Sequence, residues 1–231
     1  MIVKKLTAVI FFFISAFTNL FSQLYQQPNL GLKSHETLEL RKIEVFPERT
    51  LVSLSVENRR NEGGTFCADK NIYLIYPDGT RIKLRSSSGI PICPDTYKFK
   101  AVGEKLFFTL EFPPLKSGTK WIDIIEDCSS NCFWLYGITL DDELNKKVDE
   151  AFLLASKSDP AKTILLFRNV LETVDSQNPG IKGALYINII NAAIEAGDKV
   201  EAAVWYKRLV SSKAPRLNEY VKVLNDRGVR F

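Results

Sequence analysis

The sequence predicts two domains of different class, an antiparallel β-sandwich over residues 36–140 and a stack of helical hairpins over residues 141–231. Apolar residues recur at about every second position before residue 140, which is typical of strands with one buried face. They recur at about every 3.6 positions after it, which is typical of amphipathic helices. The change of period falls at the acidic run Asp141-Asp142-Glu143, and negative charge favours a helix N-terminus.

Residues 1–22 have the pattern of a secretory signal peptide. Lys4 and Lys5 precede an apolar run from Leu6 to Phe17, and Ser22 supplies a small residue for cleavage. The run is shorter than the ~20 apolar residues of a membrane-spanning helix, so a membrane anchor is the less favoured alternative. We therefore expect export to the periplasm or cell surface, cleavage near Ser22, and no transmembrane segment in the mature chain.

The charge balance argues against nucleic acid as a partner. The formal charge of the whole chain is +4. Cleavage of residues 1–22 would remove Lys4 and Lys5 and no acidic residue, so the mature chain would carry +2. The remaining charges are dispersed and form no concentrated basic patch of the kind that follows a phosphate backbone. The composition, 45% hydrophobic and 11% aromatic, is sufficient for a packed core.

The first domain is expected to contain eight strands. The stretch KLFFTLEF, residues 105–112, alternates between an apolar and a polar face, and Pro77-Asp78-Gly79 suits a hairpin turn. A change of face near Arg41-Lys42 predicts a bulge or an early end of the strand. Short strands separated by turns favour a two-sheet sandwich, with a closed barrel as the alternative. The expected strands are 36–45, 49–58, 71–76, 80–85, 96–101, 104–112, 121–126 and 132–140.

Three segments of this domain are similar to a known class of module. The stretches IYLIYPDGTRIKLRSSSGIP, FFTLEFPPLKSGTKWIDIIE and FWLYGITL resemble a sandwich domain of exported proteins in some Gram-negative envelopes. The resemblance covers roughly residues 36–140. It implies an immunoglobulin-like accessory module that carries no catalytic residue of its own.

The second domain is expected to contain five helices. Asp159-Pro160 is a favourable pair of N-cap and first helical residue, because proline lacks an N–H that would have no partner there. Gly197-Asp198 can end one helix and cap the next. Asn178-Pro179-Gly180 separates two others. The expected helices are 142–157, 160–176, 181–196, 199–212 and 216–226.

The stretch 184–210 resembles a tetratricopeptide repeat, and the resemblance extends to repeat-like helices over roughly residues 142–227. The matching positions of that family are Tyr186, Ile189, Ala193, Gly197, Ala202, Tyr206 and Leu209. The sequence departs from the family at Ile190, where a glycine is usual, and at Pro215, which falls one position late. The resemblance implies stacked hairpins that bury their apolar faces against each other. A generic stack of helical hairpins is the alternative.

The four cysteines are expected to form two structural disulfides, since an even number in an exported chain is typical of such bonds. Cys128 and Cys132 flank the turn between two expected strands, where opposed residues are close enough to be bridged. Cys67 would then pair with Cys93, although pairing of Cys67 with Cys128 or Cys132 stays open. No free thiol is expected.

The sequence offers little catalytic chemistry. His35 is the one histidine, and we expect it to be solvated ahead of the first strand. Gly63-Gly64 lacks the context and the lysine of a phosphate-binding loop. His35 with the cysteines gives too few ligands at zinc-finger spacing, so no metal site and no cofactor are expected.

Two candidate binding surfaces remain. Asn188, Asn191 and Glu195 share one stripe of an expected helix, which would line a peptide-binding groove if the helices stack as repeats. Trp121, Trp134 and Tyr136 could form a sugar-stacking platform, and the alternative is that they pack in the core or across strands.

The function predicted from these observations is that of an exported, non-enzymatic interaction or scaffold protein of the cell envelope, with a protein or peptide partner. The first alternative is a glycan-binding sandwich that uses the three aromatic residues. The second is a thiol-disulfide oxidoreductase that uses Cys128 and Cys132. This last alternative is disfavoured because Glu126 and Asp127, which precede Cys128, would raise a thiol pKa.

Overall fold

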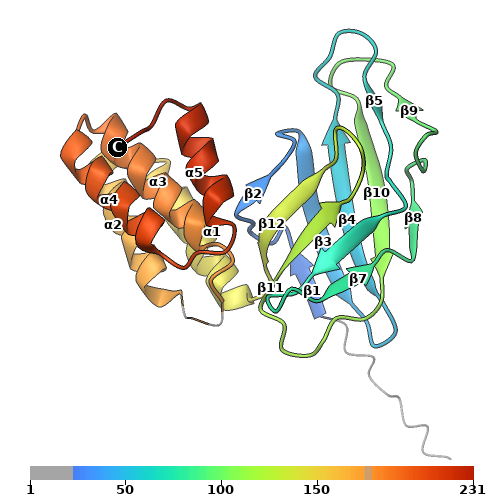
Figure 1. The fold of residues 1–231 in the computed structure, drawn as a ribbon, viewed down its shortest axis with the longest axis horizontal. Helices are drawn as coiled ribbons and strands as arrows, with labels where there is room; N and C mark the ends of the chain where they lie inside the picture. The colour runs from blue at the N-terminus through green and yellow to red at the C-terminus, as the bar shows by residue number, and fades with distance from the viewer. Residues whose placement is uncertain (1–22, 175, 177) are drawn as a thin grey trace, which may run out of the picture.

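The computed structural model describes residues 23–231 apart from residues 175 and 177, and the signal-peptide prediction for residues 1–22 lies outside them. The described residues form twelve strands followed by five helices (Figure 1). Strands end at Thr139 and helices begin at Asp142, where the change of period places the transition. No described helix has the length and apolar character needed to cross a membrane.

The first sheet has five antiparallel strands in the order β1-β3-β4-β10-β8. Their bounds are β1 Gln23–Gln26, β3 Leu38–Val45, β4 Thr50–Glu57, β10 Lys105–Phe112 and β8 Ser86–Ser88. The register of β3 against β4 shifts between Leu40 and Lys42, so the predicted bulge is confirmed. The even-numbered apolar residues of β10 are all buried, as their alternation predicts.

The second sheet also has five antiparallel strands, in the order β2-β12-β11-β6-β7. Their bounds are β2 Leu32–Lys33, β12 Trp134–Thr139, β11 Trp121–Glu126, β6 Ile72–Ile75 and β7 Arg81–Lys83. A third, two-stranded sheet pairs β5 Thr65–Phe66 with β9 Tyr97–Lys98.

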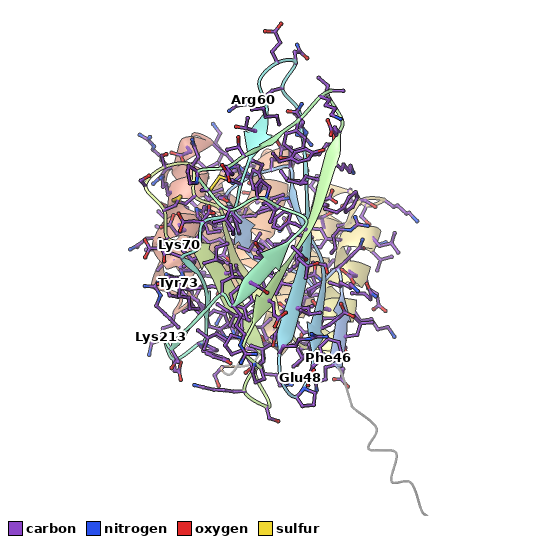
Figure 2. The ribbon with its side chains drawn as sticks, turned by 90° about the vertical axis from the view of Figure 1, so that its right-hand side faces the viewer. Phe46, Glu48, Arg60, Lys70, Tyr73 and Lys213 are labelled. Carbon is purple, nitrogen blue, oxygen red and sulfur yellow. A yellow bond between two sulfur atoms is a disulfide. The ribbon has the colours of Figure 1, made fainter. Side chains whose placement is uncertain are left out.

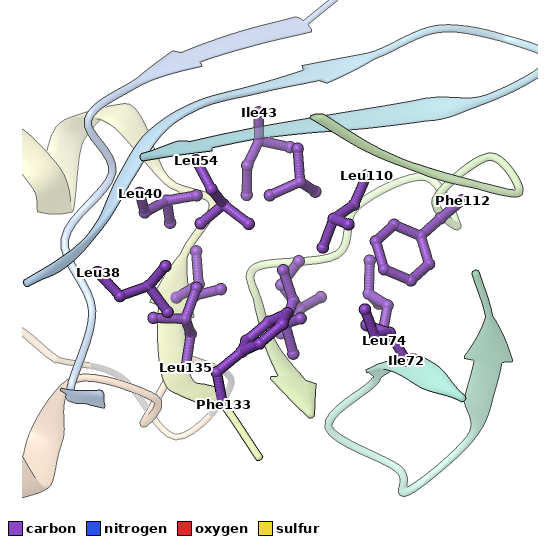
Figure 3. Packing of buried hydrophobic residues seen from close by; sticks show 14 of the residues in the cluster. Leu38, Leu40, Ile43, Leu54, Ile72, Leu74, Leu110, Phe112, Phe133 and Leu135 are labelled. Atoms are coloured by element: carbon purple, nitrogen blue, oxygen red, sulfur yellow. The ribbon is translucent and has the colours of Figure 1, made fainter. Parts of the chain in front are cut away.

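The two five-stranded sheets pack face to face as a β-sandwich. Buried residues of both sheets meet in one core, and Figure 3 shows Leu38, Leu54 and Leu110 of the first sheet facing Ile72, Leu74 and Leu135 of the second. The chain passes from one sheet to the other at both edges, between β1 and β2 and between β7 and β8. Each sheet keeps two edge strands, which agrees with a sandwich and differs from the closed-barrel alternative.

Four strands were not predicted. β2 and β5 have two residues each, which is too short to show a period. β8 is a run of serines, and β1 buries only Tyr25. The predicted strand 96–101 is reduced to β9, which lies outside the two main sheets. The other seven predicted strands are present with small changes at their ends.

All five predicted helices are present: α1 Asp142–Ala155, α2 Pro160–Thr173, α3 Lys182–Glu195, α4 Lys199–Ser211 and α5 Leu217–Asp226. Aspartates cap three of them. The carboxylates of Asp141, Asp159 and Asp198 accept hydrogen bonds from backbone N–H groups at 3.1, 2.8 and 2.8 Å, respectively. We call residues 142–231 the helical half.

The helical half packs against the outer face of the second sheet. Figure 1 shows α1 and α5 next to the sandwich, and α2 and α4 farther from it. Backbone N–H of Asn29 donates to Oδ1 of Asn145 in α1 at 2.9 Å. Leu32 of β2 packs against the core of the helical half. The two halves therefore share a contact surface.

Candidate functional site

A cleft of about 580 Å³ opens at one end of the sandwich, and we call it the loop cleft. Its lining residues come from segments 35–37, 56–69, 93–99 and 126–131, which include loops attached to both main sheets. Figure 2 shows Arg60 at this end of the sandwich, whereas Phe46 and Glu48 lie at the opposite end. Loops held by a rigid scaffold are common binding sites, which makes this cleft the candidate functional site.

Both disulfides brace the walls of the loop cleft. Cys67–Cys93 joins the chain after β5 to the loop before β9, with Cα atoms 5.4 Å apart. Backbone hydrogen bonds reinforce the connection, because the N–H of Cys93 donates to the carbonyl of Ala68 at 3.0 Å. Cys128–Cys132 closes the β11–β12 hairpin with Cα atoms 5.6 Å apart. The prediction of two disulfides is confirmed.

A buried carboxylate connects these two walls. Oε1 of Glu126 accepts a hydrogen bond from the N–H of Asp69 at 2.7 Å, in the segment that follows Cys67. Its Oε2 accepts one from the N–H of Phe133 at 2.9 Å, beside Cys132. Burial raises the pKa of Glu126, and these hydrogen bonds oppose the shift. Glu126 thus fixes one wall of the cleft relative to the other.

The alternation of β11 is a signal in the sequence for a buried carboxylate at Glu126. Ile122 and Ile124 of β11 are fully buried in the sandwich core. Glu126 is the next residue with the same parity, so strand alternation places it on the core-facing side. A charged residue at such a position is rarely buried without partners, and this combination marks a structural or functional carboxylate.

His35 lies in the lining of the loop cleft and is half-buried, so it is less exposed than expected. Its ring packs edge-on against Phe66 with centroids 6.0 Å apart, and its Nδ1 lies 2.7 Å from Oγ of Ser34. Burial lowers its pKa. The sequence pattern does not show this half-burial, because Phe66 lies in β5, a strand too short to show a period.

The three aromatic residues of the predicted sugar platform do not form one exposed surface. Trp121 is only 6% exposed, and a Cβ on Gly180 of the helical half would lie 2.9 Å from its ring, so Gly180 covers it. Tyr136 is 9% exposed and lies beneath the guanidinium of Arg216. Trp134 stacks on Tyr136 with centroids 4.3 Å apart and is the half-buried member. Strand alternation could not predict this burial, because it comes from packing of the helical half on the sandwich.

The predicted groove residues lie on α3, outside the loop cleft. Asn188 and Asn191 are half-buried and Glu195 is exposed. Nδ2 of Asn188 donates to the carbonyl of Ala184 at 2.8 Å within the same helix. The role of these three residues in peptide binding stays a prediction.

The surroundings of Cys128–Cys132 do not favour a thiolate. The bond lies in the loop between β11 and β12. Oε2 of Glu126 lies 3.9 Å from Sγ of Cys128, and a carboxylate at this distance disfavours a neighbouring negative charge. The oxidoreductase alternative stays untested.

Comparisons with models of known protein families, with curated protein sequences and with solved structures give no match for this chain.

Proposed function

We propose that the protein is an exported, non-enzymatic binding protein of the cell envelope, and that a segment of a partner protein occupies the loop cleft. The observation that carries this proposal is the construction of the cleft. Its walls come from loops of both sheets and are held by two disulfides and the Glu126 hydrogen bonds. A preorganised site loses less conformational entropy on binding than a mobile one.

The lining chemistry suits an extended peptide. Half-buried Phe66 and Phe99 offer apolar contacts, and exposed Thr65, Thr96 and Ser130 offer hydroxyl groups. Arginines and acids both occur on the rim, so neither charge dominates. Such a mixture favours a polypeptide over a polyanion, because a polyanion would require a concentrated basic surface.

The disulfides also support export. Structural disulfides persist in oxidising compartments and are rare in reducing ones. The described part of the chain holds both bonds, and its four cysteines are all paired. This agrees with the signal-peptide pattern of residues 1–22 and with a partner in the periplasm or at the cell surface.

Site-specific photocrosslinking in cells tests this proposal. A benzophenone amino acid is introduced singly at Ser130 and Thr96, on two walls of the loop cleft, at Asn191 on α3, and at Glu48 at the opposite end of the sandwich. We expect Ser130 and Thr96 to yield the same adduct in the envelope fraction, identified by mass spectrometry, and Glu48 to yield none.

The four positions separate the competing outcomes. An adduct from Asn191 without one from Ser130 or Thr96 would move the binding surface to the helical half and overturn the proposed cleft. Equal adducts from all four positions would show nonspecific contact. The absence of any adduct would count against a protein partner altogether.

A further inference from the structure

We infer that the reduced form of this protein binds one thiophilic divalent cation, such as Zn²⁺, through Cys128, Cys132 and Glu126. The ligating atoms of these three residues all lie within 4.8 Å of one another. The expectation of no metal site counted only cysteine and histidine, and it missed the carboxylate that the fold brings to the hairpin. This inference does not depend on the proposed function.

The distances match a tetrahedral site. With Zn–S of about 2.3 Å and Zn–O of about 2.1 Å, a sulfur and an oxygen on one zinc are ~3.6 Å apart. Oε2 of Glu126 and Sγ of Cys128 are 3.9 Å apart. Two sulfurs on one zinc are ~3.8 Å apart by the same geometry, and breaking the S–S bond allows that separation. The three-residue spacing of the cysteines lies within the range of known chelating pairs.

Glu126 keeps the capacity to ligate. A carboxylate has about four lone-pair sites, and Glu126 uses one on each oxygen for the N–H groups of Asp69 and Phe133. These two hydrogen bonds orient the carboxylate in the way that outer-shell partners orient metal ligands. The fourth metal ligand would be water or a group from the loop cleft, since both Glu126 and Cys128 line it.

The chemistry balances with a dithiol as the reductant. The dithiol gives two electrons and two protons to the Cys128–Cys132 bond, producing two thiols while it becomes a disulfide itself. The cation then displaces both thiol protons and binds the two thiolates. Because the disulfide and the metal site use the same sulfurs, one state excludes the other. A bound cation would therefore slow reoxidation of the hairpin.

Titration with Co²⁺, a coloured substitute for Zn²⁺, tests the inference on the purified chain. We expect the protein reduced with a phosphine to develop sulfur-to-cobalt charge-transfer absorption that saturates at one equivalent and disappears when Zn²⁺ is added. The oxidised protein should show none. Glu126→Gln should bind Co²⁺ at least tenfold more weakly, and the double variant of Cys128→Ser and Cys132→Ser should lose the absorption. The matched control is Asp127→Asn, which changes the adjacent exposed acid and should bind as the wild type does.

Circular dichroism of each reduced protein separates loss of ligand from loss of fold. If Glu126→Gln unfolds, Glu126→Asp provides a second test, because it keeps a carboxylate but shortens its reach and should weaken binding. The inference is overturned if the reduced wild type shows no charge-transfer band. It is equally overturned if folded Glu126 variants bind as tightly as the wild type, or if the band survives without Cys128 and Cys132.

Discussion

Arg216 at the start of α5 forms an ion pair with Asp123 in β11, across the boundary between the helical half and the sandwich. Nε and Nη2 of Arg216 both lie 2.9 Å from Oδ2 of Asp123. The carboxylate also accepts a hydrogen bond from the N–H of Gly137 at 2.7 Å. The Asp123 side chain is 3% exposed, whereas that of Arg216 is 36% exposed. Burial raises the pKa of Asp123, although both partners oppose the shift.

This difference in exposure predicts unequal effects of removing each partner. Arg216→Met leaves a buried carboxylate with one N–H donor, and we expect it to lower the free energy of unfolding by about 3 kcal/mol. Asp123→Asn leaves a guanidinium that can turn to water. The side-chain amide oxygen of this variant can still accept the hydrogen bond from the N–H of Gly137. We expect that change to cost about 1 kcal/mol. Urea unfolding at pH 8 measures both, and equal losses would contradict the argument.

A second contact between the halves predicts a compensating pair of substitutions. A Cβ on Gly31 would lie 1.8 Å from the hydroxyl oxygen of Tyr220, so Gly31→Ala should destabilise by roughly 2 to 3 kcal/mol through overpacking. The Tyr220 hydroxyl is buried and has no hydrogen-bond partner among the described residues. Tyr220→Phe alone should therefore change stability little or raise it slightly.

The double variant of Gly31→Ala and Tyr220→Phe should recover more than about 1 kcal/mol of the loss, because the clashing oxygen is gone. Thermal unfolding of the wild type, the two single variants and the double variant gives the coupling free energy between the two positions. Strictly additive effects would show that the hydroxyl does not limit the space beside Gly31. Gly197→Ala is a comparison outside this contact, since a Cβ there meets no heavy atom within 4 Å, although its positive φ adds backbone strain.

Local sequence signals predicted most of the fold. Three of the helices begin at an aspartate cap, such as Asp159, so their starts do not depend on distant residues. The strand β10, one of three with eight residues, also alternates cleanly. The strands β1, β2 and β8 differ, because they exist through pairing with distant partners. Ser86–Ser88 has no apolar residue, and its pairing with β10 makes it a strand.

The candidate site was less predictable for the same reason. The presence of two disulfides and the Cys128–Cys132 pairing follow from cysteine number and spacing, whereas the sequence left the partner of Cys67 open. Glu126 could have been found from the parity of β11, but its partners Asp69 and Phe133 are brought together by the fold. The burial of Trp121 depends on Gly180 from the other half of the chain. Local periodicity carries no information on such contacts.

The two disulfides should contribute unequally to stability. On the chain-entropy estimate, removing Cys128–Cys132 costs about 2 kcal/mol and removing Cys67–Cys93 costs about 3.5 kcal/mol, because the second bond closes a longer loop. Guanidinium unfolding of the two paired Cys→Ser variants measures the difference. A larger loss from the small loop would indicate that the hairpin bond holds the cleft by more than loop closure.

The same variants test the oxidoreductase alternative. We expect the wild type to accelerate the reduction of insulin by a dithiol no more than the variant without Cys128 and Cys132. This follows from the Glu126 carboxylate, whose Oε2 lies 3.9 Å from Sγ of Cys128 and disfavours a thiolate there. Faster turnover by the wild type would support the redox activity over a purely structural bond.

Tryptophan fluorescence can test the predicted sugar-binding surface. Trp121 and Trp205 are 6% and 5% exposed, whereas Trp134 is half-buried at the edge of the Tyr136 stack. Iodide, which does not enter protein interiors, should therefore quench Trp134 only, and Trp134→Phe should abolish the quenching. If a glycan binds through the predicted aromatic residues, the change in tryptophan emission that it causes must also disappear in Trp134→Phe. Quenching that persists in this variant would show that Trp121 is accessible and that the halves separate in solution.

The buried carboxylate of Glu126 predicts a pH dependence with a definite sign. The pKa of Glu126 is raised above its ordinary value of 4.5, so between that value and the raised pKa the folded state holds a proton that the unfolded state has lost. Its contribution to stability is therefore greatest below pH 4.5 and declines as the pH rises through the raised pKa. The slope cannot exceed about 1.4 kcal/mol per pH unit for one proton.

Glu126→Gln cannot ionise, so it isolates this contribution from those of other acids. The free energy of unfolding of the wild type minus that of the variant should fall as the pH rises above 4.5 and level off once Glu126 is ionised in the folded state. The variant also loses one acceptor for the N–H of Asp69 or Phe133, which adds an offset that does not vary with pH. Urea unfolding at intervals of half a pH unit measures the difference. A difference that rises with pH would mean that the two N–H donors outweigh burial, and that the carboxylate is stabilised as an anion.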